Sequence, residues 1–118
     1  MNLVRTILAS GTQAATIGVE HVLRDETGSE GKILDAFIDL GNMTITDYTE
    51  IRVFTKTLSG STLRRVYYQK FVGVQDDEPT GRSPIIYVPA ITATTEYKIT
   101  LKQTAGTGRN YDWKITTD

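Results

Sequence analysis

The chain contains one histidine, the side chain most often used as a general base near neutral pH. His21 lies in an alternating segment, where it shares a face with Ile17, Val19 and Leu23. A catalytic triad would also need a nucleophile and an orienting carboxylate, and the sequence offers neither in a recognisable arrangement. We therefore interpret His21 as structural, and a single histidine argues against a histidine-based metal site.

Two groups of carboxylates are the next candidates for chemistry. Asp76, Asp77 and Glu78 are consecutive and offer oxygen ligands of the kind that Ca²⁺ prefers, but they lack the spacing of a calcium-binding loop. Asp35 and Asp39 share one face of a predicted strand and lie about 13 Å apart, which is too far for a glycosidase pair from one strand. We therefore predict no metal, no cofactor and no enzymatic activity.

The segment A-G-T-G-R-N at 105–110 contains the G-x-G of a phosphate-binding loop. A dinucleotide-binding loop would need a small residue where Tyr111 stands and a helix after it, whereas an alternating segment follows here. The segment is more typical of a hairpin turn with glycines at positive φ.

Arginines next to tyrosines at 64–68 suggest single-strand binding, since cations and aromatic rings combine in such sites. The chain has 13 basic and 14 acidic residues and a net charge of −1, so no overall field attracts nucleic acid or an anionic membrane. We therefore predict no nucleic-acid partner and no membrane association.

Length and composition favour a single domain over 1–118. Hydrophobic residues make up 39% of the chain, enough for a core, and the absence of cysteine excludes disulfides and a thiol nucleophile. No apolar run approaches the roughly 20 residues of a membrane span, and the first residues do not read as a signal peptide. We expect the chain to be synthesised and folded in the cytoplasm.

Period-two alternation runs along most of the chain and predicts an all-β fold, an antiparallel sandwich of seven or eight strands of the Ig-like or jelly-roll type. The strands are expected near 2–9, 15–24, 32–40, 49–58, 63–74, 85–88, 94–104 and 111–118. The predicted core consists of Ile17, Val19, Leu23, Ile51, Val53, Tyr97, Ile99, Leu101, Tyr111 and Trp113.

Several segments carry apolar residues where a simple sandwich would not need them. Phe37 falls on the same side of its strand as the aspartates, as a protein-contact face would show. The segment 63–74 has large residues on both faces and is expected to be buried, or covered by a partner, on both sides. Prolines bracket 85–88, which places that strand at a sheet edge. Residues 1–9 fit either a first strand or an extended arm.

Three stretches of the sequence resemble a group of small virion-associated proteins of tailed phages and prophages. They are A-S-G-T-Q-A-A-T-I-G-V-E-H-V-L, E-I-R-V-F-T-K-T-L-S-G and I-T-L-K-Q-T-A-G-T-G-R-N-Y-D-W. The resemblance implies a structural virion protein, in particular a capsid decoration or cement protein, without implying an activity. Such a protein would bind the major capsid protein and copies of itself, with a trimer favoured.

We therefore expect a virion protein that coats or stabilises the phage head through its termini and long loops. The predicted assembly contacts are Asn2, Leu3, Val4, Arg5, Thr6, Ile7, Phe37, Asp76, Asp77, Glu78 and Arg82. The alternative is a carbohydrate- or receptor-binding module of a phage tail or fibre. In that case Phe37, Tyr67 and Tyr87 would form a stacking surface, and Asp35 or Asp39 would accept sugar hydroxyls.

Overall fold

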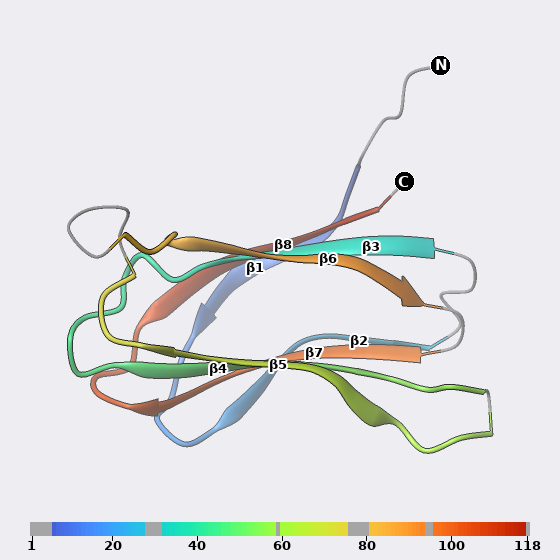
Figure 1. The fold of residues 1–118 in the computed structure, drawn as a ribbon, viewed down its shortest axis with the longest axis horizontal. Helices are drawn as coiled ribbons and strands as arrows, with labels where there is room; N and C mark the ends of the chain where they lie inside the picture. The colour runs from blue at the N-terminus through green and yellow to red at the C-terminus, as the bar shows by residue number, and fades with distance from the viewer. Residues whose placement is uncertain (1–5, 28–31, 59, 76–80, 94–95, 118) are drawn as a thin grey trace.

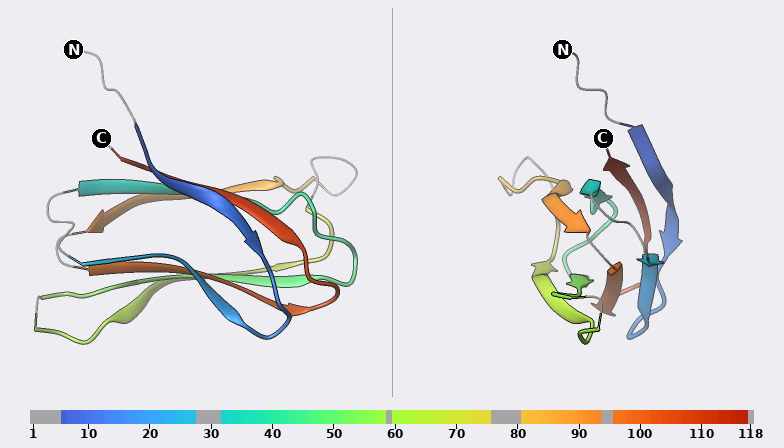
Figure 2. Two further views of the ribbon diagram at one scale, coloured as in Figure 1. Left: turned by 180° about the vertical axis from the view of Figure 1, so that it is seen from behind. Right: turned by 90° about the vertical axis from the view of Figure 1, so that its right-hand side faces the viewer.

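The computed structural model describes residues 6–27, 32–58, 60–75, 81–93 and 96–117, which form eight strands and no helix. The strands are β1 (Thr6–Ala14), β2 (Glu20–Thr27), β3 (Lys32–Asp39), β4 (Tyr48–Thr55), β5 (Arg64–Val72), β6 (Ile85–Ala93), β7 (Glu96–Ala105) and β8 (Asn110–Thr117). They pack as two layers, visible in Figures 1 and 2. The predicted all-β antiparallel sandwich is confirmed.

Each layer is a four-stranded sheet. The order is β1-β8-β3-β6 in the first, called sheet A, and β2-β7-β4-β5 in the second, called sheet B. Only β4 and β5 follow each other within one sheet, as the predicted hairpin. The prediction of a hairpin turn at 105–110 is wrong, because the strands on either side do not pair with each other. β7 pairs with β2 and β4, whereas β8 pairs with β1 and β3. The A-G-T-G-R-N segment therefore connects the two sheets.

The core lies between the sheets and follows the predicted alternation closely. Seven of the ten predicted core residues are buried: Leu23, Ile51, Val53, Tyr97, Ile99, Leu101 and Tyr111. The face of β3 opposite Asp35, Phe37 and Asp39 is also buried: Leu34, Ala36 and Ile38, followed by Leu40.

The other three predicted core residues differ in burial. Ile17 and Val19 are 39% and 44% exposed, so their assignment is wrong. They lie in the turn at 15–19 between β1 and β2, in which the Val19 N–H bonds the Thr16 carbonyl at 3.0 Å. Trp113 is half-buried and packs against the core. It faces Gly11 on the edge strand β1, where an added Cβ would lie 3.4 Å from the indole.

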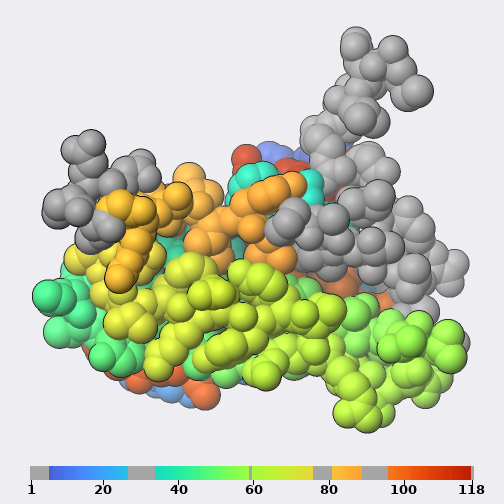
Figure 3. Space-filling model, viewed as in Figure 1, coloured from blue at the N-terminus to red at the C-terminus, as the bar shows by residue number. Residues whose placement is uncertain are grey.

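The edges of the sheets fall on β1, β6, β2 and β5. The edge position of β6 was predicted from its prolines, and the register of β6 against β3 shifts between Val88 and Ile91, around Pro89. The prediction that β5 is buried on both faces by its own chain is wrong. Val66, Tyr68 and Val72 are 64%, 40% and 43% exposed, and the yellow-green β5 region lies open along the lower part of the near face in Figure 3. Its coverage by a partner stays a prediction.

The N-terminal segment is a strand from Thr6 onward. Thr6 pairs with Thr117 and Ile7 with Thr116, so these two predicted arm residues belong to the edge of sheet A. The remaining predicted arm contacts, Asn2 to Arg5, lie outside the described residues.

Candidate functional site

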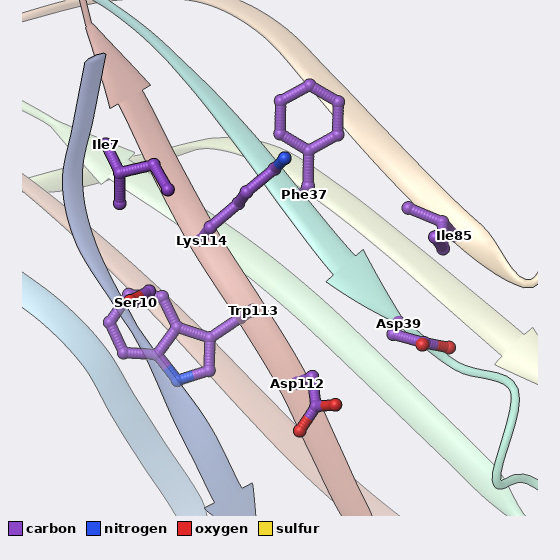
Figure 4. Close-up of a pocket in the computed structure, with 8 residues that line it drawn as sticks. All are labelled: Ile7, Ser10, Phe37, Asp39, Ile85, Asp112, Trp113 and Lys114. Atoms are coloured by element: carbon purple, nitrogen blue, oxygen red, sulfur yellow. The ribbon is translucent and has the colours of Figure 1, made fainter.

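The outer face of sheet A carries an open groove of about 570 Å³. Figure 4 shows that its lining comes from β1, β8, β3 and the start of β6. The lining residues are Ile7, Ser10, Phe37, Asp39, Ile85, Asp112, Trp113 and Lys114. Two of the predicted contacts, Ile7 and Phe37, therefore meet in one surface although they lie far apart in the sequence.

A row of side chains crosses the middle of this face. Phe37 pairs with Tyr87 on one side and with Lys114 on the other, because β3 lies between β6 and β8. The rings of Phe37 and Tyr87 stack with centroids 4.8 Å apart, and the Lys114 ammonium lies 4.9 Å from the Phe37 centroid. These contacts fix the Phe37 ring between its two neighbours. The hydrocarbon stem of Lys114 adds to the apolar surface.

Apolar side chains extend this surface toward both ends of the groove. Ile7 is 62% exposed at one end and Ile85 is 54% exposed at the other. The polar groups on the rim already have partners: Asp112 accepts a hydrogen bond from the Thr12 hydroxyl at 2.6 Å, and Asp39 accepts one from the Gly41 N–H at 2.8 Å. The groove is suited to contact with an apolar partner rather than to acid–base chemistry.

The other residues of the predicted stacking surface do not join this groove. Tyr67 points inward from β5, opposite Val53, and is half-buried, and burial raises the pKa of its phenol. Asp35 has the predicted parity with Phe37 and Asp39 but does not line the groove. The predicted sugar platform is thus divided: Phe37 lines this groove, whereas Tyr67 and Tyr87 line a second hollow together with Arg82.

The remaining predicted site residues lie elsewhere. Arg82 donates from Nη1 to the Val72 carbonyl at 2.8 Å, next to the end of β5. Asp76, Asp77 and Glu78 lie outside the described residues. His21 is half-buried rather than in the core, and its Nε2 accepts a hydrogen bond from the Thr16 N–H at 3.0 Å. It thereby fixes the β1–β2 turn, in line with the structural interpretation.

A buried carboxylate at one end of the sandwich was not predicted from the sequence. The Asp47 side chain is completely buried, and the loop that contains it meets the β7–β8 connection at the left in Figure 1. It accepts hydrogen bonds from the N–H groups of Thr44 and Thr107, at 2.8 and 3.1 Å. The Arg109 Nε donates a third, at 2.8 Å. We call Asp47 with these three partners the Asp47 clamp.

The electrostatics of the clamp favour the ionised carboxylate. Burial alone would raise the pKa of Asp47. Hydrogen bonds from Thr44, Arg109 and Thr107, together with the arginine charge, outweigh burial and hold the pKa below its usual range.

The glycines of the A-G-T-G-R-N segment make the clamp possible. Gly106 has φ of +91°, and a Cβ there would lie 1.9 Å from the Asp47 carboxylate. A Cβ on Gly108 would lie 2.3 Å from the Ala15 carbonyl oxygen. One glycine was therefore correctly expected at positive φ, while the other permits a close approach to the backbone. A signal for the clamp exists in T-I-T-D at 44–47, because a carboxylate three residues after a threonine can close a turn.

A second buried group holds the same loop from the β7 side. The Gln103 amide donates to the carbonyls of Ala105 and Thr107, at 3.1 and 2.7 Å. Its oxygen accepts hydrogen bonds from the Arg109 N–H at 3.1 Å and from the Tyr111 hydroxyl at 3.0 Å. Buried polar groups satisfied in this way make the end of the sandwich rigid.

The residues that the structure describes contain neither a metal-ligand cluster nor a membrane-spanning helix. No group of three or more His, Cys, Asp or Glu residues there is arranged to hold a metal ion. None of the described segments forms a helix of the length and apolar character needed to span a bilayer.

Comparisons with family models, with curated proteins and with solved structures gave no match for this chain.

Proposed function

We propose that the chain is a structural protein of a phage particle, a capsid decoration or cement subunit that works as a homo-oligomer on the major capsid protein. The observation that carries the proposal is the groove on sheet A, where Ile7, Phe37 and Ile85 present apolar surface outside the core. Exposed apolar surface of this kind is typical of protein contacts. The resemblance of three sequence segments to phage virion proteins is the reason for assigning this contact to a phage particle.

The strand order supports the jelly-roll form of the sandwich. The strands pair as β1 with β8, β2 with β7, β3 with β6 and β4 with β5. This is a folded ribbon of four nested antiparallel pairs. An immunoglobulin-type sandwich keeps its first two strands in one sheet, whereas β1 and β2 lie in different sheets here. Jelly rolls are common in viral capsid proteins and lectins, so this analogy fits both candidate functions.

Many equivalent copies explain how a small groove could hold a shell together. Each copy placed across a junction between capsid subunits adds a modest contact, and the shell repeats that contact many times. On this proposal the groove binds a neighbouring subunit, and the predicted contacts Asn2 to Arg5 precede the groove residue Ile7 in the sequence.

Mass spectrometry of purified particles tests the proposal. The chain should be present in a fixed ratio to the major capsid protein, and its absence from intact particles would reject a virion role. A variant lacking residues 2–5 should fold normally, since β1 begins at Thr6. The truncated variant should occupy fewer sites on the particle. Full occupancy would show that residues 2–5 do not contribute to the contact.

A second candidate function is carbohydrate binding at the same groove. It is favoured by Asp39 and Asp112, whose carboxylates lie beside the aromatic row and can accept hydroxyl hydrogen bonds. The flanking of Phe37 by Tyr87 and Lys114 weakens it, because a sugar stacks on an open ring face. Glycan-array binding that is lost in Asp39→Asn would favour this function over the first.

A further inference from the structure

The β3–β4 loop exposes a large apolar side chain at its tip. Ile45 is 80% exposed and occupies the turn at 44–47. The Asp47 N–H closes this turn onto the Thr44 carbonyl at 3.0 Å, and the Asp47 carboxylate accepts the Thr44 N–H at 2.8 Å. Asp47 therefore closes the turn that carries Ile45 twice, once with its backbone N–H and once with its carboxylate.

Neighbouring loops hold the turn from two further sides. Arg109 donates to the Thr44 hydroxyl at 3.0 Å as well as to Asp47. The Gly73 N–H donates to the Asp47 carbonyl at 2.9 Å, and Gly73 has φ of +75°. A Cβ on Gly73 would lie 3.6 Å from the Ile45 carbonyl oxygen. The loop is thus fixed by the segment that follows β5 and by the β7–β8 connection.

An apolar side chain on a rigid support is suited to binding. A side chain fixed before contact loses little conformational entropy when it enters a pocket. Residues that dominate protein contacts are typically such anchors, and they insert into apolar pockets on the partner. Ile45 has the character of an anchor, and its partner must offer an apolar hollow with polar groups at the rim.

The groove on sheet A has these properties. Its volume of about 570 Å³ is large enough for an isoleucine with part of its loop. Ile85 and Phe37 supply apolar walls, and the carboxylates of Asp39 and Asp112 lie at the rim. Thr46 is exposed beside Ile45, and its hydroxyl can donate to such a carboxylate.

We propose that Ile45 of one copy inserts into the sheet A groove of a second copy. This inference rests on the proposed function only in treating the groove as a contact between subunits. The anchor lies on a loop at the end of the sandwich and the groove lies on a sheet face, so the contact joins two different surfaces. Such a heterologous contact continues from copy to copy and produces a closed ring or a filament.

The test uses three exposed apolar residues. Ile45→Asp removes the anchor, and Ile85→Asp places a charge in the groove. Leu58→Asp is the matched control, because Leu58 is 69% exposed on the β4–β5 loop and lies in neither surface. All three sites are exposed, so circular dichroism should show folded variants. Sedimentation velocity then gives the size of each species over a concentration series reaching about 1 mM, where contacts as weak as a millimolar Kd are visible.

Wild type and Leu58→Asp should assemble, while Ile45→Asp and Ile85→Asp should each stay monomeric. An equal mixture of these two should form a dimer that grows no further, because one intact anchor meets one intact groove. A monomeric wild type, a mixture that stays monomeric, or an equal effect of Leu58→Asp would overturn the proposal. None of these outcomes changes whether the chain is found in particles, so the two proposals can fail separately.

Discussion

Two regions of the molecule join carboxylates to arginines in different surroundings. At the end of the sandwich, Asp47 is completely buried, and Arg109 is 2.8 Å away. On the outer face of sheet B, Arg52 lies between Glu50 at 3.0 Å and Glu20 at 3.6 Å, and all three side chains keep some solvent contact. Both regions pair a carboxylate with a guanidinium, but only the first carboxylate depends wholly on protein donors.

This difference separates a structural charge from a surface charge. A buried carboxylate that loses its partner is left in a medium of low dielectric, whereas a solvent-facing one regains water. The polar side chains on the outer face of sheet B also contact one another. Tyr68 donates a hydrogen bond to Glu50, and the guanidinium groups of Arg52 and Arg65 both contact the Tyr68 ring. Both sheets expose apolar side chains, but on sheet A those of Ile7, Phe37 and Ile85 line one groove, which is why we place the subunit contact there.

The largest effect is expected from Asp47→Ala. The substitution leaves Arg109 and two loop N–H groups without their acceptor, so the free energy of unfolding should fall by about 3–5 kcal/mol. Denaturant melts followed by tryptophan fluorescence would measure it. A loss below about 1 kcal/mol would mean that the clamp does not hold the loops together.

Acid should remove the stabilisation that Asp47 provides. Its pKa is lowered in the folded chain from an ordinary value of 3.8, so the contribution is complete above pH 3.8 and is lost as the pH falls through the lower, folded value. The stability difference between wild type and Asp47→Asn should therefore be constant near neutral pH and shrink below pH 3.8. A difference that persists unchanged in strong acid would contradict an ionised Asp47.

An intermediate effect is expected from Trp113→Ala. A fully buried tryptophan would lose about 3–5 kcal/mol, but this ring is half-buried against Gly11, so we expect about 2 kcal/mol. Urea melts followed by circular dichroism are needed, because the variant lacks the chain's tryptophan. A loss as large as that of Asp47→Ala would show that the indole contributes as a core residue.

The smallest effect is expected from Glu50→Gln on the outer face of sheet B. The exchange removes a charge but keeps an acceptor for Tyr68, so the loss should stay within about 1 kcal/mol. The hydrogen bond to Glu50 raises the pKa of Tyr68 above 10.0, and in the variant this pKa should return toward 10.0. Ultraviolet titration of the tyrosines measures it. An unchanged titration would mean that Glu50 does not contact Tyr68 in solution.

Alternation in the sequence predicted the strands whose neighbours lie on both sides. In β3, β4 and β7 every second side chain meets the core, and the predicted faces are correct. The same rule failed for Ile17 and Val19, because a turn can continue the apolar pattern without belonging to a strand. It failed for β5 because large residues on both faces of a strand do not reveal whether anything covers the outer face of its sheet.

The candidate site was only partly predictable for a related reason. Phe37 was recognised from its parity, but its meeting with Ile7 and Ile85 depends on the pairing of strands far apart in the sequence. The T-I-T-D segment at 44–47 indicates a turn closed by Asp47 but not the burial of its carboxylate. Its role follows from the missing Cβ of Gly106, about 60 residues later in the chain.

The most direct test of the account is binding of the purified chain to phage particles made without it. Co-sedimentation should show saturable binding of wild type in a fixed ratio to the capsid protein. Ile85→Asp, in the groove, should abolish binding, whereas Leu58→Asp, on the β4–β5 loop, should leave it intact. Failure of wild type to bind, or equal binding by both variants, would contradict a subunit contact on sheet A.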